Sequence, residues 1–242
     1  MAIEIKHNKV AIIIPAYNEH ENIQRLINQI NYYLDKPNII VIDDSPNSKT
    51  YNLIKNKKIK INYFHRNKKA GRGSAVIFAL KKIIKNKNIK AIIEMDADFS
   101  HPPKEINRNL KYFSKKNLDL LISSRYIKGS KIINWPISRT ILSFISNKLA
   151  KLLLSIPVSD YTNGFRIYSL RSSKIIIKKC GKIGDGFIIL SEILHEIYKA
   201  KLKIGEINTV FLNRARGESS VNSKLLLVSF IGLLKLFIKR FE

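Results

Sequence analysis

Short apolar runs of strand length alternate with segments of helical periodicity in the first half of the chain, and this alternation constrains the fold most. The runs lie at Val10 to Ile14, Ile39 to Ile42, Ile59 to Phe64, Ala91 to Met95 and Leu118 to Ser123. Helices are expected after Asn18 and over Ala75 to Ile84. The pattern predicts an α/β domain with a mostly parallel central sheet and flanking helices. Ligands of such sheets bind beyond the carboxyl ends of the strands.

Length and charge limit the organisation and the partners. A chain of 242 residues suits one domain, and we expect residues 1–242 to form it. Its net charge of +26 raises nucleic acid, an anionic membrane surface or an anionic substrate as the partner. We find no basic groove interleaved with aromatic residues, so no nucleic-acid partner is expected. A basic nucleic-acid-binding protein remains the remote alternative.

Two amphipathic segments in the second half predict peripheral association with a membrane. Residues 138–156 and 223–241 each combine an apolar face with lysines and arginines. No uncharged apolar run reaches the roughly 18 residues of a membrane span, since the nearest candidate, Leu225 to Ile238, is shorter and contains Lys235. The single cysteine, Cys180, and the absence of an apolar signal in the first ten residues indicate the cytoplasmic side of the membrane. The alternative is a pair of core helices with solvated basic faces.

The fourth expected strand is followed directly by two carboxylates. Asp96 and Asp98 are two positions apart, so in extended backbone they point to the same side. Such a pair can hold Mg²⁺ or Mn²⁺ against a diphosphate, whose oxygens and water complete the coordination shell. Aspartates after a strand are also ordinary turn formers, so neighbouring strand ends must decide.

Two other strand ends carry side chains suited to a nucleoside. The first strand leads into Pro15-Ala16-Tyr17-Asn18-Glu19, and the second ends at Asp43 and Asp44. A tyrosine ring can stack on a base, and the carboxylates of Glu19 and Asp44 can accept hydrogen bonds from base or ribose groups. Three acidic strand ends in one domain indicate a common site.

The motifs at these positions resemble those of the inverting family 2 nucleotide-sugar glycosyltransferases, and among them the dolichyl-phosphate (polyprenyl-phosphate) mannose synthases. The matching text runs from VAIIIPAYNEHENI through VIDDS, AGRGSA, EMDADFSHPP and SSRY to DYTNGFRIY and NRARGES. The order of DADFSHPP, SRY and D-x-T-x-G-F-R is the specific part. The resemblance implies the nucleotide-diphospho-sugar transferase fold of GT-A type.

The resemblance also implies the residues of a donor site. The donor-binding residues would be Pro15, Tyr17, Glu19, Ile42, Asp44, Asp96, Ala97, Asp98, Arg125 and Arg214. The metal, Mg²⁺ or Mn²⁺, would be held by Asp96 and Asp98, with Ser100 as a weak third ligand. One departure is Ser220, which stands where relatives often have a phosphate-binding lysine. Arg216 or Lys224 could substitute for that lysine.

An acceptor site is implied in the second half. Asp160, Thr162, Gly164 and Arg166 would line the site near the transferred sugar, although they could also form a capped turn. Arg125, Arg139 and Ser143 would clamp the acceptor phosphate, since Arg139 and Ser143 are four residues apart and share a helix face. Asp98 and these three residues are therefore the predicted catalytic set. A salt bridge from Arg139 to a neighbouring acid is the alternative.

The resulting functional prediction is transfer of a sugar, most simply mannose from GDP-mannose, to a polyprenyl or dolichyl phosphate with inversion. The region after Tyr126 is poor in acids, and a phosphate acceptor is already ionised, so no protein general base is expected. Transfer of another sugar, such as glucose from UDP-glucose, or transfer to a glycan acceptor remains open. Small membrane subunits are a further possible partner.

Three other sequence features, a glycine pair, a histidine and the cysteine, are expected to serve the fold rather than the chemistry. Gly71-Arg72-Gly73 is expected to form a tight turn before a helix, because Val76 stands where a dinucleotide fingerprint needs its third glycine. His101, beside the metal motif, could serve helix entry before Pro102-Pro103. Cys180 is expected to be a buried apolar residue.

Overall fold

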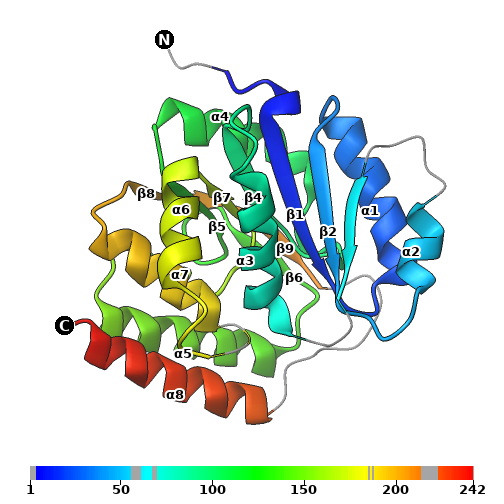
Figure 1. Cartoon of the computed structure of the whole chain (residues 1–242). Coiled ribbons are helices and arrows are strands. Elements are labelled where there is room, and N and C mark those ends of the chain that lie inside the picture. The colour runs from blue at the N-terminus through cyan, green and yellow to red at the C-terminus, as the bar shows by residue number, and fades with distance from the viewer. Residues whose placement is uncertain are drawn as a thin grey trace.

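The computed structural model describes residues 4–55, 61–66, 70–184, 186, 188–213 and 223–241. Figure 1 shows one sheet flanked by helices, with the N-terminus at the end opposite the last helix. The strands are β1 (Val10–Ala16), β2 (Asn38–Asp43), β3 (Ile61–His65), β4 (Ala91–Glu94), β5 (Leu120–Ser124), β6 (Lys131–Ile133), β7 (Arg166–Tyr168), β8 (Ile204–Asn208) and β9 (Val210–Leu212). The α-helices are α1 (His20–Tyr33), α2 (Lys49–Ile54), α3 (Gly71–Ile83), α4 (Ile106–Lys115), α5 (Ile137–Leu154), α6 (Leu170–Lys179), α7 (Ile188–Lys199) and α8 (Ser223–Lys239). Short 3₁₀ turns, η1 (His7–Lys9) and η2 (Pro103–Glu105), precede β1 and α4.

The seven-stranded sheet has the order β3-β2-β1-β4-β7-β5-β8, and β6 and β9 form a separate pair. All neighbours in the large sheet are parallel except β7, which runs antiparallel to both β4 and β5. The chain proceeds outward from β1 to β3 and then returns to place β4 on the other side of β1. The strand order therefore reverses between β1 and β4, and open α/β sheets bind ligands beyond the carboxyl ends of the strands at such a point.

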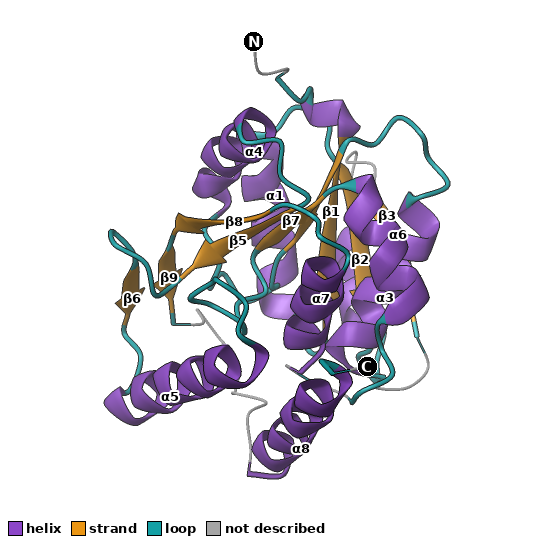
Figure 2. Cartoon of the chain, turned by 90° about the vertical axis from the view of Figure 1, so that its left-hand side faces the viewer, coloured by secondary structure: helices purple, strands orange, loops and turns teal. Residues whose placement is uncertain are grey.

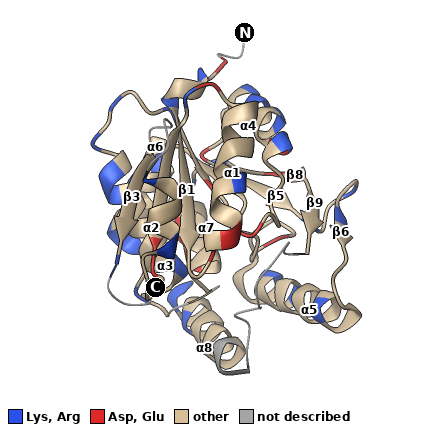
Figure 3. Cartoon of the chain, turned by 90° about the vertical axis from the view of Figure 1, so that its right-hand side faces the viewer, with Lys and Arg blue, Asp and Glu red and all other residues tan. Residues whose placement is uncertain are grey.

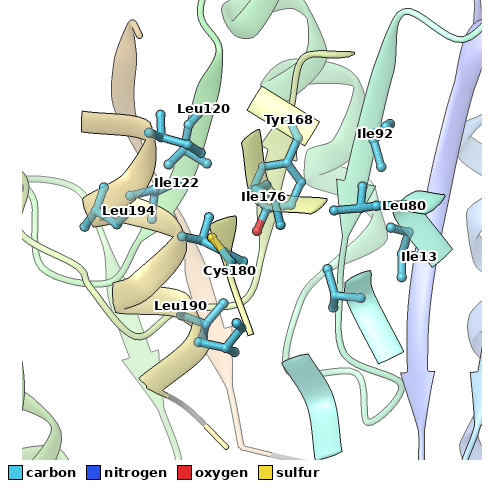
Figure 4. Close-up of a cluster of buried hydrophobic side chains, with 14 of the residues drawn as sticks. Ile13, Leu80, Ile92, Leu120, Ile122, Tyr168, Ile176, Cys180, Leu190 and Leu194 are labelled. Atoms are coloured by element: carbon cyan, nitrogen blue, oxygen red, sulfur yellow. The ribbon is translucent and has the colours of Figure 1, made fainter. Parts of the chain in front are cut away.

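Alternate residues of the parallel strands build two hydrophobic layers. In β1, Val10, Ile12 and Ile14 face α1 and α4, whereas Ala11 and Ile13 face α3 and α7. Both sets are buried because successive side chains of a strand point to opposite faces. Continuous apolar runs are therefore what a parallel sheet covered on both faces requires. The close-up in Figure 4 shows the second layer, in which helix and strand side chains interdigitate.

The glycine pair at 71 and 73 belongs to the first turn of α3 rather than to a turn before it, which corrects the sequence interpretation. Gly71 opens the helix with φ of 79°, a backbone conformation that favours glycine. A Cβ at Gly73 would lie 2.6 Å from Ile189, so this glycine allows α3 and α7 to approach closely. Close packing here fixes where the intervening Arg72 points.

The helices α5 and α8 lie side by side at the end of the molecule toward which β1 and β2 point (Figures 1 and 2). Their exposed apolar residues are Ile137, Ile141, Leu142, Phe144, Ile145 and Leu152 on α5, and Leu226, Leu227, Phe230, Ile231, Leu234 and Ile238 on α8. Lysines and arginines occur along both helices (Figure 3). Among the described helices, none has both the length and the apolar character to cross a bilayer.

The carboxyl-terminal end of α8 is fixed to its neighbours by charged side chains. The Lys239 ammonium donates to a Glu196 carboxylate oxygen on α7 at 2.6 Å. The Arg240 guanidinium donates to the carbonyl of Leu153 at 3.0 Å and to the Ser155 hydroxyl at 2.8 Å, at the end of α5. These contacts hold the two helices as one surface.

Candidate functional site

The carboxyl ends of β1, β2, β4 and β5 bring most of the expected site residues to one edge of the sheet. Asp44, just beyond β2, accepts two hydrogen bonds from the Arg66 guanidinium at 2.5 and 2.6 Å, and a third from the backbone N–H of Ala70. Asp43 serves the fold instead, because its carboxylate accepts from the Tyr63 hydroxyl at 2.7 Å. Of the two adjacent aspartates, only Asp44 is therefore presented at the edge.

The segment after β1 crosses beside this edge. The Tyr17 side chain is 40% exposed and thus accessible for stacking. Asn18 has φ of 58°, and its N–H donates to the Ser45 hydroxyl at 2.8 Å, which joins the loops after β1 and β2. Glu19 precedes α1 and accepts from the Asn22 amide at 2.8 Å. These hydrogen bonds fix the backbone of the loop after β1 around the exposed Tyr17 ring.

Two of the expected donor residues have no side chain at the edge. Ile42 is fully buried in the hydrophobic layer beneath α3, and Ala97 is buried as well. Pro15 is half-buried within β1. The resemblance assigned these positions to nucleoside binding, and the structure leaves only backbone groups of Ile42 and Ala97 for such a contact.

Asp96 is paired with Arg72, a residue that the sequence pattern placed in a turn before a helix. Arg72, in the first turn of α3, forms ion pairs with Asp96 and with the fully buried Glu94. Burial acts against the charge of Arg72, but Asp96 and Glu94 raise its pKa above the ordinary value. Glu94 also accepts from the Tyr168 hydroxyl at 2.6 Å. In the sequence, Glu94 within the apolar run AIIEM was a sign that a buried cation lies nearby, because a buried carboxylate needs a positively charged partner.

Asp98 and Ser100 provide the oxygens that suit a divalent cation. Asp98 is 8% exposed, and its Oδ1 accepts the Ser100 N–H at 3.1 Å. The Ser100 Oγ is buried and has no hydrogen-bond partner among the described residues. Phe99 between them has φ of 65°, a strained conformation for a bulky residue that occurs preferentially at functional sites.

This oxygen set fits Mg²⁺ or Mn²⁺ bound together with a diphosphate. An unsatisfied buried oxygen costs about 1–3 kcal/mol, and coordination by Ser100 Oγ would remove that cost. Within the described part of the chain, no three His, Cys, Asp or Glu side chains form a closed metal cage. Mg²⁺ commonly takes one or two carboxylates, with phosphate oxygens and water supplying the rest. Asp98 and Ser100 supply two such oxygens, and Asp96 is paired with Arg72.

His101 is a structural bridge beneath the metal motif. Its Nδ1 accepts the Asp96 N–H at 2.9 Å, and its Nε2 lies 2.9 Å from the Asn163 amide oxygen. The ring is buried and stacks on Phe165. Burial lowers the pKa of His101, so the ring is neutral near pH 7. The histidine therefore ties the loop after β4 to the loop before β7.

Arg125 and Asp160 form a buried bidentate pair behind the edge. The Nε and Nη2 atoms of Arg125 donate to the Asp160 carboxylate at 2.8 Å each, and Nη2 also reaches the Thr162 hydroxyl at 2.7 Å. Burial opposes both charges, yet Asp160 raises the pKa of Arg125 and Arg125 lowers that of Asp160. The structure thus brings together the SRY arginine and the D-x-T motif.

Asn147 connects this pair to α5. Its amide donates to the Thr162 hydroxyl at 3.1 Å, and its Oδ1 accepts the Tyr161 N–H at 2.6 Å. One helical turn earlier, the Ser143 hydroxyl accepts from the Tyr126 hydroxyl at 2.6 Å. The inner face of α5 is therefore joined to the loop of Asp160 and Thr162, while its outer face carries exposed apolar side chains.

Arg139 lies in the first turn of the same helix against an indole ring. Its guanidinium carbon is 4.1 Å from the centroid of Trp135, and its Nη1 donates to the Asn213 amide oxygen at 3.4 Å. The half-buried Trp135 ring packs on Arg139 and edge-on against Phe211.

Arg166 and Gly164 shape the site from behind. The Arg166 guanidinium is fully buried and donates to the carbonyls of Asn163, Leu190 and Tyr161 at 2.7–2.9 Å. A Cβ on Gly164 would collide with the Arg72 guanidinium, so glycine is needed for that ion pair to form. Both residues support the loop rather than face an open site. Arg214, Arg216 and Ser220 lie outside the described residues, and no side chain is described for Lys224.

Comparison with known proteins identifies the family. The glycosyl transferase family 2 model matches residues 11–176, which is more than half of the chain. The chain belongs to this family. Within it, the chain is 34% identical over 223 residues to the dolichol-phosphate mannosyltransferase of Pyrococcus furiosus, covering 89% of this chain and 60% of that protein.

Two further relatives carry similar names. The polyprenol monophosphomannose synthase of Mycolicibacterium smegmatis is 32% identical over 164 residues, covering 66% of this chain and 61% of that protein. The undecaprenyl-phosphate mannosyltransferase of Micrococcus luteus is 27% identical over 218 residues and covers 88% of each chain. This chain therefore spans about 60% of the length of the first two relatives.

Solved structures confirm the GT-A fold expected for a family 2 chain. Glucosyl-3-phosphoglycerate synthase from Mycobacterium tuberculosis, in complex with Mn²⁺, UDP and glucosyl-3-phosphoglycerate, matches with a TM-score of 0.67 at 15% identity. The match covers 96% of this chain and 79% of that one. A complex of the same enzyme with Mn²⁺, UDP-glucose and phosphoglyceric acid gives a TM-score of 0.68 at 16% identity.

Proposed function

We propose that this family 2 chain transfers mannose from GDP-mannose to a polyprenyl or dolichyl phosphate, with inversion and with Mg²⁺ or Mn²⁺ as cofactor. The observation that carries the proposal is the double role of α5. One face of this helix is hydrogen-bonded to the Arg125–Asp160 pair through Asn147 and Thr162, and the other exposes Ile141, Ile145 and further apolar residues. A site wall that is also an apolar surface suits a charged acceptor on a lipid tail.

On the donor side, each group has a distinct task. Tyr17 would stack on the base, and Glu19 and Asp44 would accept hydrogen bonds from base or ribose. Asp98 with Ser100 Oγ would hold the metal, which supplies positive charge to stabilise the leaving diphosphate. Arg125 and Arg214 would add cationic hydrogen-bond donors toward the phosphates. Asp96 would act mainly by fixing Arg72 beside the diphosphate, given their ion pair.

On the acceptor side, positioning would replace base catalysis. Arg125, Arg139 and Ser143 would hold the acceptor phosphate so that one of its oxygens faces the anomeric carbon opposite the diphosphate, which gives inversion. A phosphate monoester is already ionised near neutral pH, so no proton needs to be removed before attack. The loop of Asp160 and Thr162 would fix the SRY arginine in this geometry.

The exposed apolar side chains of α5 and α8 also support a proposal for where the chain is located. We infer that α5 and α8 lie on the cytoplasmic face of a membrane, with apolar side chains in the interface and lysines near anionic headgroups. The exposed aromatic residues Phe144 and Phe230 support this inference. Small membrane subunits could add further contacts to the same surface.

Thermal stabilisation by a panel of nucleotide sugars, with and without Mn²⁺, tests the donor assignment. GDP-mannose at about 100 times its Kd should add roughly 2.7 kcal/mol, and only when Mn²⁺ is present. Stabilisation by UDP-glucose alone would replace mannose with glucose in the proposal. A salt-sensitive shift with DNA, and none with any nucleotide sugar, would instead support the nucleic-acid-binding alternative.

A further inference from the structure

We propose that Trp135 is a ligand-contacting residue of the acceptor site, where its indole N–H donates to an acceptor phosphate oxygen while its ring orients Arg139. The inference rests on the proposed function, because it refines the site at which the acceptor phosphate would bind. It adds Trp135, in the segment before α5, to the two arginines and the serine already proposed to hold the acceptor phosphate.

Two cations from different elements share the Trp135 ring. The guanidinium carbon of Arg139, on α5, is 4.1 Å from the ring centroid, and that of Arg125, after β5, is 5.6 Å away. Phe211 of β9 packs against the ring at 5.1 Å with an interplanar angle of 76°. Such stacking fixes the plane of a guanidinium whatever its N–H edge binds.

The indole N–H of Trp135 is an unsatisfied donor. Trp135 Nε1 is buried and has no hydrogen-bond partner among the described residues. Buried tryptophan N–H groups usually find a partner, and leaving one unsatisfied costs about 1–3 kcal/mol. A ligand that satisfies this donor supplies an acceptor atom such as an oxygen. The Arg139 guanidinium on the ring favours a negatively charged ligand, whereas the charge of Arg125 is already paired with Asp160.

The position of Trp135 in the chain agrees with an anion. The residue directly precedes Pro136, the N-cap of α5, and Arg139 lies in the first helical turn. The amino end of an 18-residue helix presents backbone N–H groups and the positive end of the helix dipole. The indole N–H, the guanidinium groups and the helix end together match a phosphate monoester.

The fluorescence of this residue provides a direct test, because Trp135 is the single tryptophan of the chain. Titration of the full chain with a short-chain polyprenyl phosphate should give a saturable change in tryptophan emission. The matched neutral polyprenol should give none, and inorganic phosphate should give a weaker change with the same sign. An unchanged emission at acceptor concentrations that saturate transfer would overturn the proposal.

Kinetics of variants separate the N–H from the ring. Trp135→Phe keeps a ring face for Arg139 but removes the donor, so the KM for polyprenyl phosphate should rise about tenfold while the KM for the nucleotide sugar stays unchanged. Trp135→Leu removes both and should also lower kcat. Tyr32→Phe, at an exposed ring on α1, is the control and should match wild type. A wild-type acceptor KM for Trp135→Phe contradicts the inference.

A third variant separates failure of this inference from failure of the proposed function. Arg139→Lys keeps the charge but loses the guanidinium fork, so the clamp requires a large fall in transfer with nearly unchanged nucleotide-sugar binding. Wild-type transfer by Arg139→Lys would refute the acceptor clamp itself. A defect in Arg139→Lys without one in Trp135→Phe would refute only the role of Trp135.

Discussion

At the scale of single residues, three of the expected site carboxylates are each bound to an arginine. Asp44 pairs with Arg66, and Asp96 pairs with Arg72. The third pair joins Asp160 to Arg125. Removing one member of a buried pair leaves an uncompensated charge, so substitutions there change stability together with activity. The metal assignment is tested at Asp98, whose carboxylate accepts the Ser100 N–H of its own short loop and is not part of these three pairs.

Asp98→Asn should abolish turnover while the fold stays intact. The amide keeps the size of the side chain and an acceptor for the Ser100 N–H, but it loses the negative charge that a divalent cation needs. Turnover is measured as transfer of the sugar from the nucleotide sugar to polyprenyl phosphate, and folding as the midpoint of thermal unfolding. Asp35→Asn, at an exposed position, is the matched control and should match wild type. Substantial turnover by Asp98→Asn would remove Asp98 from the metal site.

Arg166→Met should lower stability rather than alter sugar specificity. The substitution leaves three buried carbonyls without the donor they now share. We expect the free energy of unfolding to fall by about 3 kcal/mol and the melting temperature by roughly 6–12 °C. Arg171→Met, at a 68% exposed arginine paired with Asp119, should cost less than about 1 kcal/mol. Equal losses in the two variants would contradict the structural role of Arg166.

At the scale of elements, the apolar faces of α5 and α8 should carry membrane binding. Replacing Phe144 and Phe230 together by Gln should weaken binding to anionic liposomes about tenfold, because each ring would lose part of the roughly 1.5–3 kcal/mol of full burial. Both rings are about half exposed, so stability should hardly change. Flotation in a density gradient measures the binding. Tyr32→Gln, on α1, is the control, and an equal loss there or no loss in the double variant would contradict the assignment.

The sequence predicted the elements that have a strong local pattern. All five expected strands and the helices over 138–156 and 223–241 are confirmed to within a few residues. The antiparallel β7 was not expected, because three residues cannot show a period and the reversal depends on tertiary pairing with β4 and β5. Element type was therefore readable from local periodicity, whereas strand order was not.

The sequence predicted only those candidate site residues whose side chains suit the chemistry and that also follow an expected strand directly. Asp96, Asp98 and Asp44 stand at strand ends and were found there. Arg72 was missed as a site residue because it reaches Glu94 across a packing contact, made possible by Gly164 far along the chain. Such partners appear only once α3, β4 and the loop before β7 are brought together.

At the scale of the whole molecule, the fold places the strand ends that carry the proposed donor residues near the exposed apolar surface of α5 and α8. The carboxyl ends of β1 and β2 point toward α5 and α8, so a donor bound at the sheet edge and an acceptor held at a lipid surface would meet there (Figure 1). Excess EDTA should abolish transfer, and Mn²⁺ added back should restore it, since the diphosphate charge is otherwise uncompensated. Full activity in EDTA would show that the chain's own cations suffice.

The most direct test of the account is transfer of labelled mannose from GDP-mannose by the purified chain, in the presence of Mn²⁺ and liposomes that contain a polyprenyl phosphate. The account predicts a lipid-linked mannose of inverted anomeric configuration, and none when the neutral polyprenol replaces the phosphate. Efficient transfer to the polyprenol, or a product with retained configuration, would contradict it.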